Sequence, residues 1–311
     1  MSDYEAILKA YELSGGNPRA LQFPDVGSLV VKENKVLSSN EVEGLFLKSE
    51  ETSKGVKAKL LVKKGCQIRN PVHLCFGVIP EEGIQEIIMD ILLEDNSSVE
   101  LLAHCTFPNA VKVKHIMTAK IKIGRVSSLK YSEVHYHGVK GGIEVIPKAE
   151  VDIAPQGRFH NNFTLIQGRV GKLNIDYNVK VAEKGVVELI AKVYGKEKDE
   201  IKIKESVFLN GEEAKGLTKS RVVVIDKAKS EVIGETYGNA PGARGHVDCV
   251  EIIEGEAQAE AIPKVSVSNS EAKVTHEAAI GRVDKKQIET LMARGLGEAE
   301  AIDVVIGGML K

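Results

Sequence analysis

The feature that most constrains the fold of this sequence is a repeat of about 29 residues in its central part. Turns in which a small residue leads into an apolar stretch recur at Ser98, Ser128, Gly157 and Gly185, and more weakly at Ala214, with gaps of 30, 29, 28 and 29 residues. Short runs rich in β-branched residues lie between these turns, which is typical of strands. In a stacked solenoid, residues one period apart lie on neighbouring coils, roughly 4.8 Å apart.

Two architectures are compatible with this pattern. A parallel β-helix with about 29 residues per coil fits better than a leucine-rich solenoid, whose repeats are shorter. The alternative is a pair of β-sandwich domains, in which strands and turns recur at much shorter intervals. The periodicity favours the solenoid. We therefore predict a mainly β chain whose parallel β-helix core occupies residues 28–281.

Helices are predicted at both ends of the chain. Ser2 can cap a first helix, with Glu5 in the reciprocal capping position, so residues 1–27 are interpreted as an N-terminal helix and lead-in. Asp284 can cap the first of two short helices in a C-terminal segment, residues 282–311. These two helices either cover the open end of the solenoid or form a docking surface.

The charge balance and the apolar pattern restrict the partners and the compartment. Lysine and arginine number 42 against 44 aspartates and glutamates, which argues against nucleic-acid binding. No apolar run approaches the ~20 residues of a membrane span, and the acidic N-terminus lacks a signal-peptide pattern. The four cysteines include no C-x-x-C pair. We expect a cytoplasmic protein with free thiols.

The familiar catalytic motifs are missing from the sequence. Gly168–Lys172 is too short to form a phosphate-binding loop, and there is no G-x-S-x-G nucleophile elbow. Nucleotide hydrolysis and serine-based catalysis are therefore not expected.

The strongest candidate for site chemistry is Cys249 with His276 and Glu277. Cys249 and Glu277 are 28 residues apart, close to one period. Thiolate, imidazole and carboxylate are common ligands of iron and zinc. One cysteine cannot hold an iron–sulfur cluster alone, so a second chain or transient ligands would be needed. The alternative is a buried cysteine that packs as a small hydrophobe, beside a local hydrogen-bond network.

A second candidate lies upstream. Cys75, Cys105 and His135 are spaced by 30 and 30 residues, and are predicted to stack on three successive coils. His137 lies on the same side of its strand as His135, since side chains alternate, which suggests a secondary metal site. A purely structural role is the alternative. About five coils, or roughly 24 Å, separate Cys105 from Cys249, so the two thiols are not expected to ligate one metal within one chain.

Several segments resemble the SufB and SufD scaffold subunits of the SUF iron–sulfur assembly machinery. Three of these segments lie near the C-terminus and surround Cys249, the H-E-A cluster with the helix after it, and the last helix: Gly242–Gly255, Ala272–Leu296 and Glu298–Leu310. Two more lie upstream, at Ala103–Pro108 and Leu129–Gly138. The resemblance covers roughly residues 55 to 311, without the longer N-terminal region of the bacterial subunits.

This resemblance implies a right-handed parallel β-helix and a non-catalytic scaffold, not an enzyme, that builds a transient iron–sulfur cluster, with no permanently bound cofactor. It implies that residues 282–311 dock a SufC-type ABC ATPase. By position, Cys249 matches the family's core cysteine, Glu277 its acidic neighbour and His276 a histidine of both subunit types. Cys105 would accept sulfur from a donor protein, because sulfur exchange proceeds by thiolate attack.

Retention of both Cys249 and Glu277 makes the chain SufB-like, and we expect a homodimer through the β-helix that shares ligands between its two copies. A SufD-like adaptor that holds the ATPase without binding metal is the alternative. Polysaccharide-acting enzymes also use parallel β-helices, but the chain has no tryptophan and few aromatic residues for sugar platforms.

Overall fold

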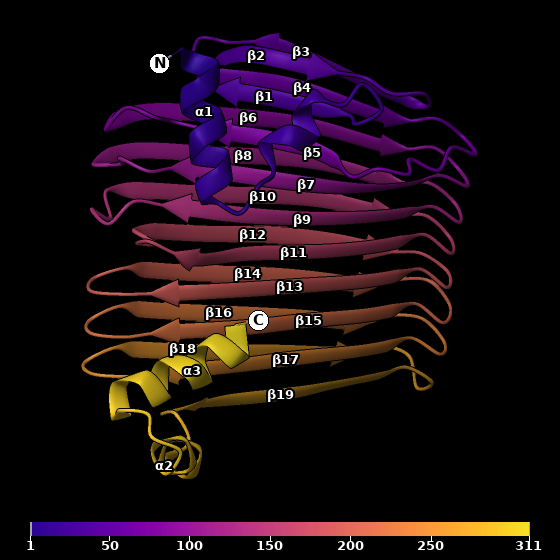
Figure 1. The fold of residues 1–311 in the computed structure, drawn as a ribbon. Helices are drawn as coiled ribbons and strands as arrows, with labels where there is room; N and C mark the ends of the chain where they lie inside the picture. Colours follow the sequence, from indigo (N-terminus) through magenta and orange to yellow (C-terminus); the bar gives the residue numbers. More distant parts are fainter. Residues whose placement is uncertain (1, 311) are drawn as a thin grey trace.

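The computed structural model describes residues 2–310, in which the chain winds into a flattened solenoid of two facing parallel sheets (Figure 1). From β4 onward, successive strands alternate between the sheets, so each coil contributes one strand to each. Within the described residues, the first sheet has ten strands, which are β1 (Ser28–Lys32), β2 (Lys35–Asn40), β5 (Val72–Gly77), β7 (Ser98–Phe107), β9 (Ser128–His137), β11 (Arg158–Gln167), β13 (Val186–Gly195), β15 (Lys215–Val224), β17 (Arg244–Ile253) and β19 (Lys273–Gly281). The second has nine, which are β3 (Leu45–Glu51), β4 (Gly55–Val62), β6 (Glu82–Leu93), β8 (Lys112–Ile123), β10 (Ile143–Ile153), β12 (Lys172–Val181), β14 (Glu200–Leu209), β16 (Lys229–Gly238) and β18 (Gln258–Val267).

The strand register reproduces the period of the sequence. Ser98 pairs with Ser128, Ser128 with Arg158, and Arg158 with Val186, always in parallel. Each coil therefore places its turn directly beside the same turn of the next coil. In the second sheet the strands from β12 to β18 pair in the same way, each one coil after the last. The predicted parallel β-solenoid is confirmed, and the β-sandwich alternative is wrong.

The core lies between the two sheets and follows from strict alternation along each strand. In β13, Leu189, Ala191 and Val193 point inward and are fully buried, while the residues between them are partly exposed. Each inward aliphatic side chain stacks on its counterpart one coil away. Burial of one such side chain stabilises the fold by roughly 1.5–3 kcal/mol.

The N-terminal end of the solenoid has antiparallel edge strands, and a helix lies against the outside of the first sheet there. β1 pairs antiparallel with β2, and β3 with β4. Helix α1 (Asp3–Leu13) has the predicted capping box at Ser2 and Glu5 and lies across β1, β5 and β7, followed by a 3₁₀ turn, η1 (Pro18–Gln22) (Figure 1). Residues 1 and 311, which are the outer ends of the predicted segments 1–27 and 282–311, lie outside the described residues.

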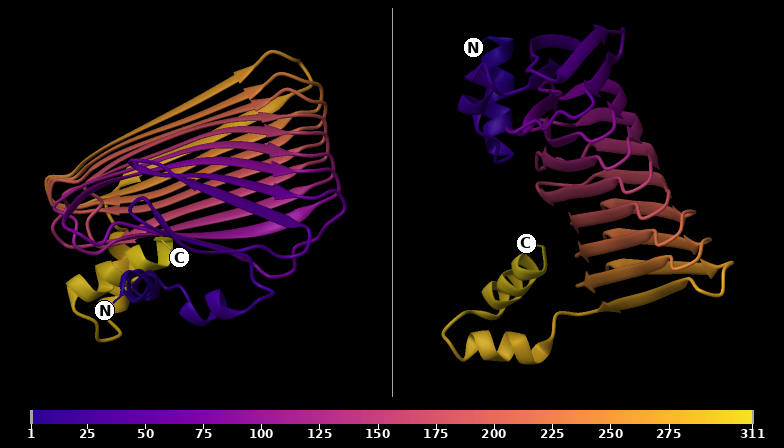
Figure 2. Two further views of the ribbon diagram at one scale, coloured as in Figure 1. Left: turned by 90° about the horizontal axis from the view of Figure 1, so that it is seen from above. Right: turned by 90° about the vertical axis from the view of Figure 1, so that its right-hand side faces the viewer.

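The C-terminal end of the solenoid remains open. Asp284 caps α2 (Lys285–Met292), as predicted, and α3 (Glu298–Leu310) turns back along the outside of the first sheet (Figure 2). Ile306 and Leu310 pack there against Val223 and Ile252. The last strands, β18 and β19, are mostly exposed, so the helices do not cover the end as a cap.

A strained turn residue gives a stability test. Val126 adopts a left-handed conformation with φ of 56° in the turn before β9, and its side chain is exposed. Because this conformation costs a β-branched residue about 1–2 kcal/mol and asparagine tolerates it, Val126→Asn is expected to raise the unfolding free energy by about 1 kcal/mol. Urea denaturation measures the gain. Val139→Asn, at an exposed position without positive φ, is the control, and no gain at residue 126 over residue 139 would contradict the assignment.

Candidate functional site

Cys249 lies on the inner face of β17, one coil from the open end of the solenoid. Its side chain is buried, and its register partners are Ser220 in β15 and Ala278 in β19. The sulfur lies 3.9 Å from Oε1 of Glu251, two residues further along the same face. Glu251 is also buried and accepts a hydrogen bond from the Ser230 hydroxyl. Cys249 and Glu251 therefore form a buried thiol–carboxyl pair.

Burial controls the protonation of this pair. It raises the pKa of Cys249 to about 12, with a further increase from the nearby Glu251 carboxylate. It raises the pKa of Glu251 to about 7, against the hydrogen bonds from Ser230 and Cys249. The resting thiol is thus protonated at neutral pH. Glu251 changes charge near neutral pH and lies beside the thiol.

The structure places His276 and Glu277 on opposite faces of the terminal strand. His276 pairs with Val247, which points inward like Cys249, whereas Glu277 pairs with Asp248. Asp248 faces outward, where Arg221 binds its carboxylate. Both His276 and Glu277 are exposed. Cys249 and His276 therefore share a face near the open end, and Glu277 is not brought together with them.

Cys105 lies on the inner face of β7, beside His135 of β9, as expected from their spacing. Ligand atoms of Cys105, Glu133 and His135 all lie within 4.8 Å of one another, and all three residues are buried. Within residues 2–310, no other set of three histidine, cysteine or acidic residues brings its ligand atoms that close. Glu133 was not among the sequence candidates.

The predicted ladder of Cys75, Cys105 and His135 is wrong at Cys75. The register of β5 on β7 pairs Cys75 with His104, the residue before Cys105, so Cys75 points to the face opposite Cys105. Cys75 packs beneath α1, against Tyr11. The four cysteines are free thiols in this chain.

Helix α1 also covers two histidines of the same outer face. The Tyr11 hydroxyl lies 2.7 Å from Nδ1 of His73, and the Ser14 hydroxyl lies 2.7 Å from Nδ1 of His104. Burial lowers the pKa of His104 to about 4, so the imidazole is neutral. These contacts give Cys75, His73 and His104 a structural role, which is to hold the helix on the sheet.

His135 and His137 follow Glu133 on the inner face of β9. Nε2 of His135 lies 2.6 Å from Oε1 of Glu133, and its Nδ1 lies 3.3 Å from Nε2 of His137. Nδ1 of His137 donates to the Arg169 carbonyl at 2.8 Å. Burial lowers the pKa of both histidines to about 3 and raises that of Glu133 to about 7. Both histidines are therefore neutral at pH 7, and Glu133 changes charge near neutral pH.

Parity along the strands is the signal that could have found the missed carboxyl groups. Glu133 has the parity of the inward Tyr131, and Glu251 that of Cys249. Glu205 likewise follows the inward Ile203 in β14, and burial raises its pKa to about 8. A carboxylate at an apolar-parity position is costly to bury, which marks it as a candidate for function.

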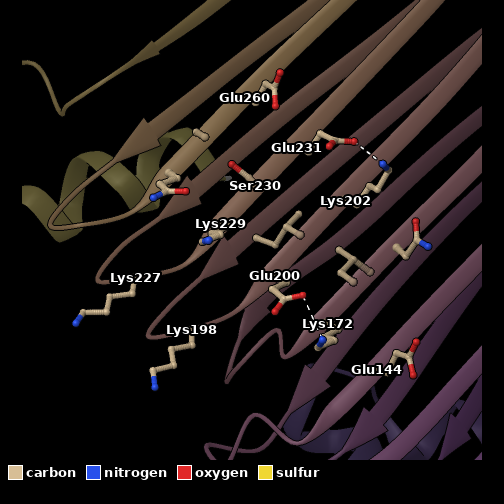
Figure 3. Close-up of a pocket in the computed structure, with 15 residues that line it drawn as sticks. Glu144, Lys172, Lys198, Glu200, Lys202, Lys227, Lys229, Ser230, Glu231 and Glu260 are labelled. Carbon is tan, nitrogen blue, oxygen red and sulfur yellow. Dashed lines mark ion pairs between the residues drawn. The ribbon is translucent and has the colours of Figure 1, made fainter.

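The outer face of the second sheet has a different character. A broad, shallow depression crosses the starts of β10 to β18, where lysines and glutamates of neighbouring coils alternate (Figure 3). Lys172 pairs with Glu200 at 3.3 Å, and Lys202 pairs with Glu231 (Figure 3). Exposed pairs of this kind stabilise a fold by less than about 1 kcal/mol each. We interpret this face as a solvated surface.

The fold and its inward thiols define a parallel β-solenoid protein with cysteine sites inside the coil. The family model for the SufBD core domain of the SUF system of iron–sulfur cluster assembly matches residues 82–309. The chain therefore belongs to the SufBD family of iron–sulfur cluster assembly proteins.

Similar proteins occur in archaea and bacteria. A SufBD family protein of Methanocaldococcus jannaschii is 41% identical over 98% of this chain and 96% of its own length. One of Pyrococcus horikoshii is 33% identical over 100% of this chain and 94% of its own length. A Staphylococcus aureus member is 33% identical over 23% of this chain and 16% of its own length. Among residues 2–310, no helix is long and apolar enough to cross a membrane.

Proposed function

We propose that this chain is a scaffold subunit that assembles a transient iron–sulfur cluster at Cys249 with an ABC-type ATPase. The observation that carries the proposal is the position of Cys249, which shares a face with His276 one coil from the open end of a SufBD solenoid. Thiolates hold iron–sulfur clusters, and histidine is an accepted substitute. The chain supplies ligands, and ATP hydrolysis belongs to the partner.

A second copy of the chain would complete the ligand set. The outer edge of β19 has no strand beside it within the described residues, and exposed strand edges readily pair with another chain. A homodimer through this end of the β-helix would bring two copies of Cys249 and His276 together. The exposed Glu277 would supply a ligand only across such a junction, since within one chain it faces away from Cys249.

Sulfur would enter at Cys105 in chains whose Cys105 pocket holds no metal ion. In this step the Cys105 thiolate attacks the sulfane sulfur of a donor persulfide, a new sulfur–sulfur bond forms, and the donor thiolate leaves. Glu133 lies next to the thiol, and its carboxylate form can accept the thiol proton. The donor is a persulfide-carrying protein.

We divide the chain into a lead-in at residues 1–27, a β-helix core at residues 28–281 and a C-terminal segment at residues 282–311. The C-terminal segment would dock the SufC-type ATPase. Met292 and Val304 leave about half of their surface exposed on α2 and α3, which provides apolar contacts for a partner. The protein would work in the cytoplasm, without binding nucleic acid.

One observation favours the SufD-like adaptor as a second candidate. Within one chain, the structure brings Cys249 together with neither Glu277 nor a second thiol. An adaptor would still bind the ATPase through α2 and α3 but would not need Cys249.

Anaerobic reconstitution with ferrous iron and sulfide tests the scaffold function. Wild type is expected to gain visible charge-transfer absorption and acid-labile sulfide, and Cys249→Ala is expected to lose both, because no other thiol lies at the proposed junction. Cys66→Ala is the matched control, since Cys66 is half-buried near the N-terminal end. If wild type stays colourless with the ATPase present, or if Cys249→Ala matches it, the scaffold function at Cys249 is wrong.

A further inference from the structure

We propose that the interior pocket formed by Cys105, Glu133 and His135 is a site for one divalent transition-metal ion of the zinc or ferrous type. It is distinct from the cluster proposed at Cys249 and does not depend on it. In this site His115 would be the fourth ligand.

The first argument is the convergence of three different ligand types. Sγ of Cys105, a carboxylate oxygen of Glu133 and a ring nitrogen of His135 lie within 4.8 Å of one another. Ligands of one tetrahedral ion, each about 2.0–2.3 Å from the metal, lie at mutual distances below this value. Small side-chain movements would therefore close the site around an ion.

The second argument is a set of unsatisfied polar atoms. Both ring nitrogens of His115 are buried without a hydrogen-bond partner, and so is Oε2 of Glu133. The His115 ring lies in β8, with its centre 5.9 Å from that of His135. Buried polar groups normally have partners, since an unpaired one costs about 1–3 kcal/mol. A metal ion at this point would bind one nitrogen of His115 and an oxygen of Glu133 at once.

The third argument is the orientation of His135. Because the Arg169 carbonyl can only accept, His137 donates from Nδ1, and its Nε2 then accepts from Nδ1 of His135. This chain of hydrogen bonds fixes the tautomer of His135 and directs the lone pair of Nε2 toward Glu133 and Cys105. Metal-ligating histidines are typically held in this way by a hydrogen bond from the second ring nitrogen.

The donor set and the charge select the kind of ion. Thiolate with imidazole favours zinc or ferrous iron, whereas magnesium and calcium prefer oxygen ligands. A divalent ion displaces one proton from Cys105 and one from Glu133, so the filled site has no net charge. Neutrality matters because the pocket lies inside an apolar solenoid, where an unpaired charge is costly. Phe107 and Phe163 flank His135 and keep the site dry.

The test is the metal content of the full-length protein, produced with zinc in the medium so that the pocket fills as the chain folds. Wild type is expected to contain about one zinc per chain by mass spectrometry. Exchange for cobalt is expected to give a thiolate-to-cobalt charge-transfer band and the visible bands of a tetrahedral ion. No metal and no cobalt band in wild type overturn the proposal, whatever the variants do.

Variants locate the metal. Cys105→Ser and the isosteric Glu133→Gln are expected to lose the zinc and the charge-transfer band, with folding checked by circular dichroism. Cys75→Ser and Cys249→Ala are matched controls that keep both, because their thiols lie outside the pocket. Equal metal in wild type and Cys105→Ser, or loss only in Cys249→Ala, overturns the assignment. Because no sulfide is added, these outcomes are independent of cluster assembly.

Discussion

Replacing Asp199 by alanine is expected to lower the free energy of unfolding by about 3–5 kcal/mol. The Asp199 carboxylate is fully buried and binds Nε and Nη2 of Arg169 at 3.1 and 2.8 Å. It also accepts hydrogen bonds from the backbone N–H groups of Val170, Gly171 and Lys196. Alanine would leave these donors unpaired in the interior, and unpaired buried donors are the costly case.

Urea denaturation measures this loss. Asp176→Ala is the control, because that aspartate lies exposed on the neighbouring β12 and its removal should change stability by less than about 0.5 kcal/mol. Asp199 also orders the turn whose Arg169 carbonyl holds His137, so its loss would disturb the Cys105 pocket. A loss below about 1 kcal/mol at Asp199 would contradict this account of the turn.

Replacing Glu205 by glutamine is expected to have the opposite effect, a gain of about 3 kcal/mol at pH 7. Glu205 lies buried on the inner face of β14, and burial raises its pKa from 4.5 to about 8. At pH 7 the folded chain must keep this carboxyl protonated while the unfolded chain releases the proton. Glutamine has nearly the same shape and no proton to release, so it avoids this cost.

The sign of the pH dependence follows from the raised pKa. The contribution of Glu205 to stability is complete below about pH 4.5 and is lost as the pH rises toward about 8. The variant and wild type should therefore have equal stability at pH 4 and diverge up to pH 8. Glu200→Gln, at the exposed start of the same strand, is the control. Curves that stay parallel from pH 4 to pH 8 would refute the raised pKa.

The architecture could be predicted from the sequence because the turn residues recur with the period of the coil. Every coil needs a tight turn before its strand of the first sheet, so small residues recur at Ser98, Ser128, Gly157 and Gly185. Helix caps at Ser2 and Asp284 are local signals and were also correct. The path of α3 along the first sheet depends on long-range packing of Ile306, which no local pattern records.

The predicted site residues that do not come together are those whose spacing in the sequence differs by one residue from the local coil length. Cys249 pairs with Ala278, so Glu277, one residue earlier, pairs with Asp248 and faces outward. Cys75 likewise pairs with His104, one residue short of Cys105. A slip of one residue moves a side chain to the other face of a sheet. Cys105 and His135 were placed correctly because the register pairs them directly.

Cluster transfer tests the central claim, assembly at Cys249, most directly. Wild type, loaded anaerobically with iron and sulfide in the presence of its ATPase, would be mixed with an apo iron–sulfur acceptor protein. We predict that wild type and Cys66→Ala restore the acceptor's cluster spectrum and that Cys249→Ala does not. Equal restoration by Cys249→Ala would contradict the account.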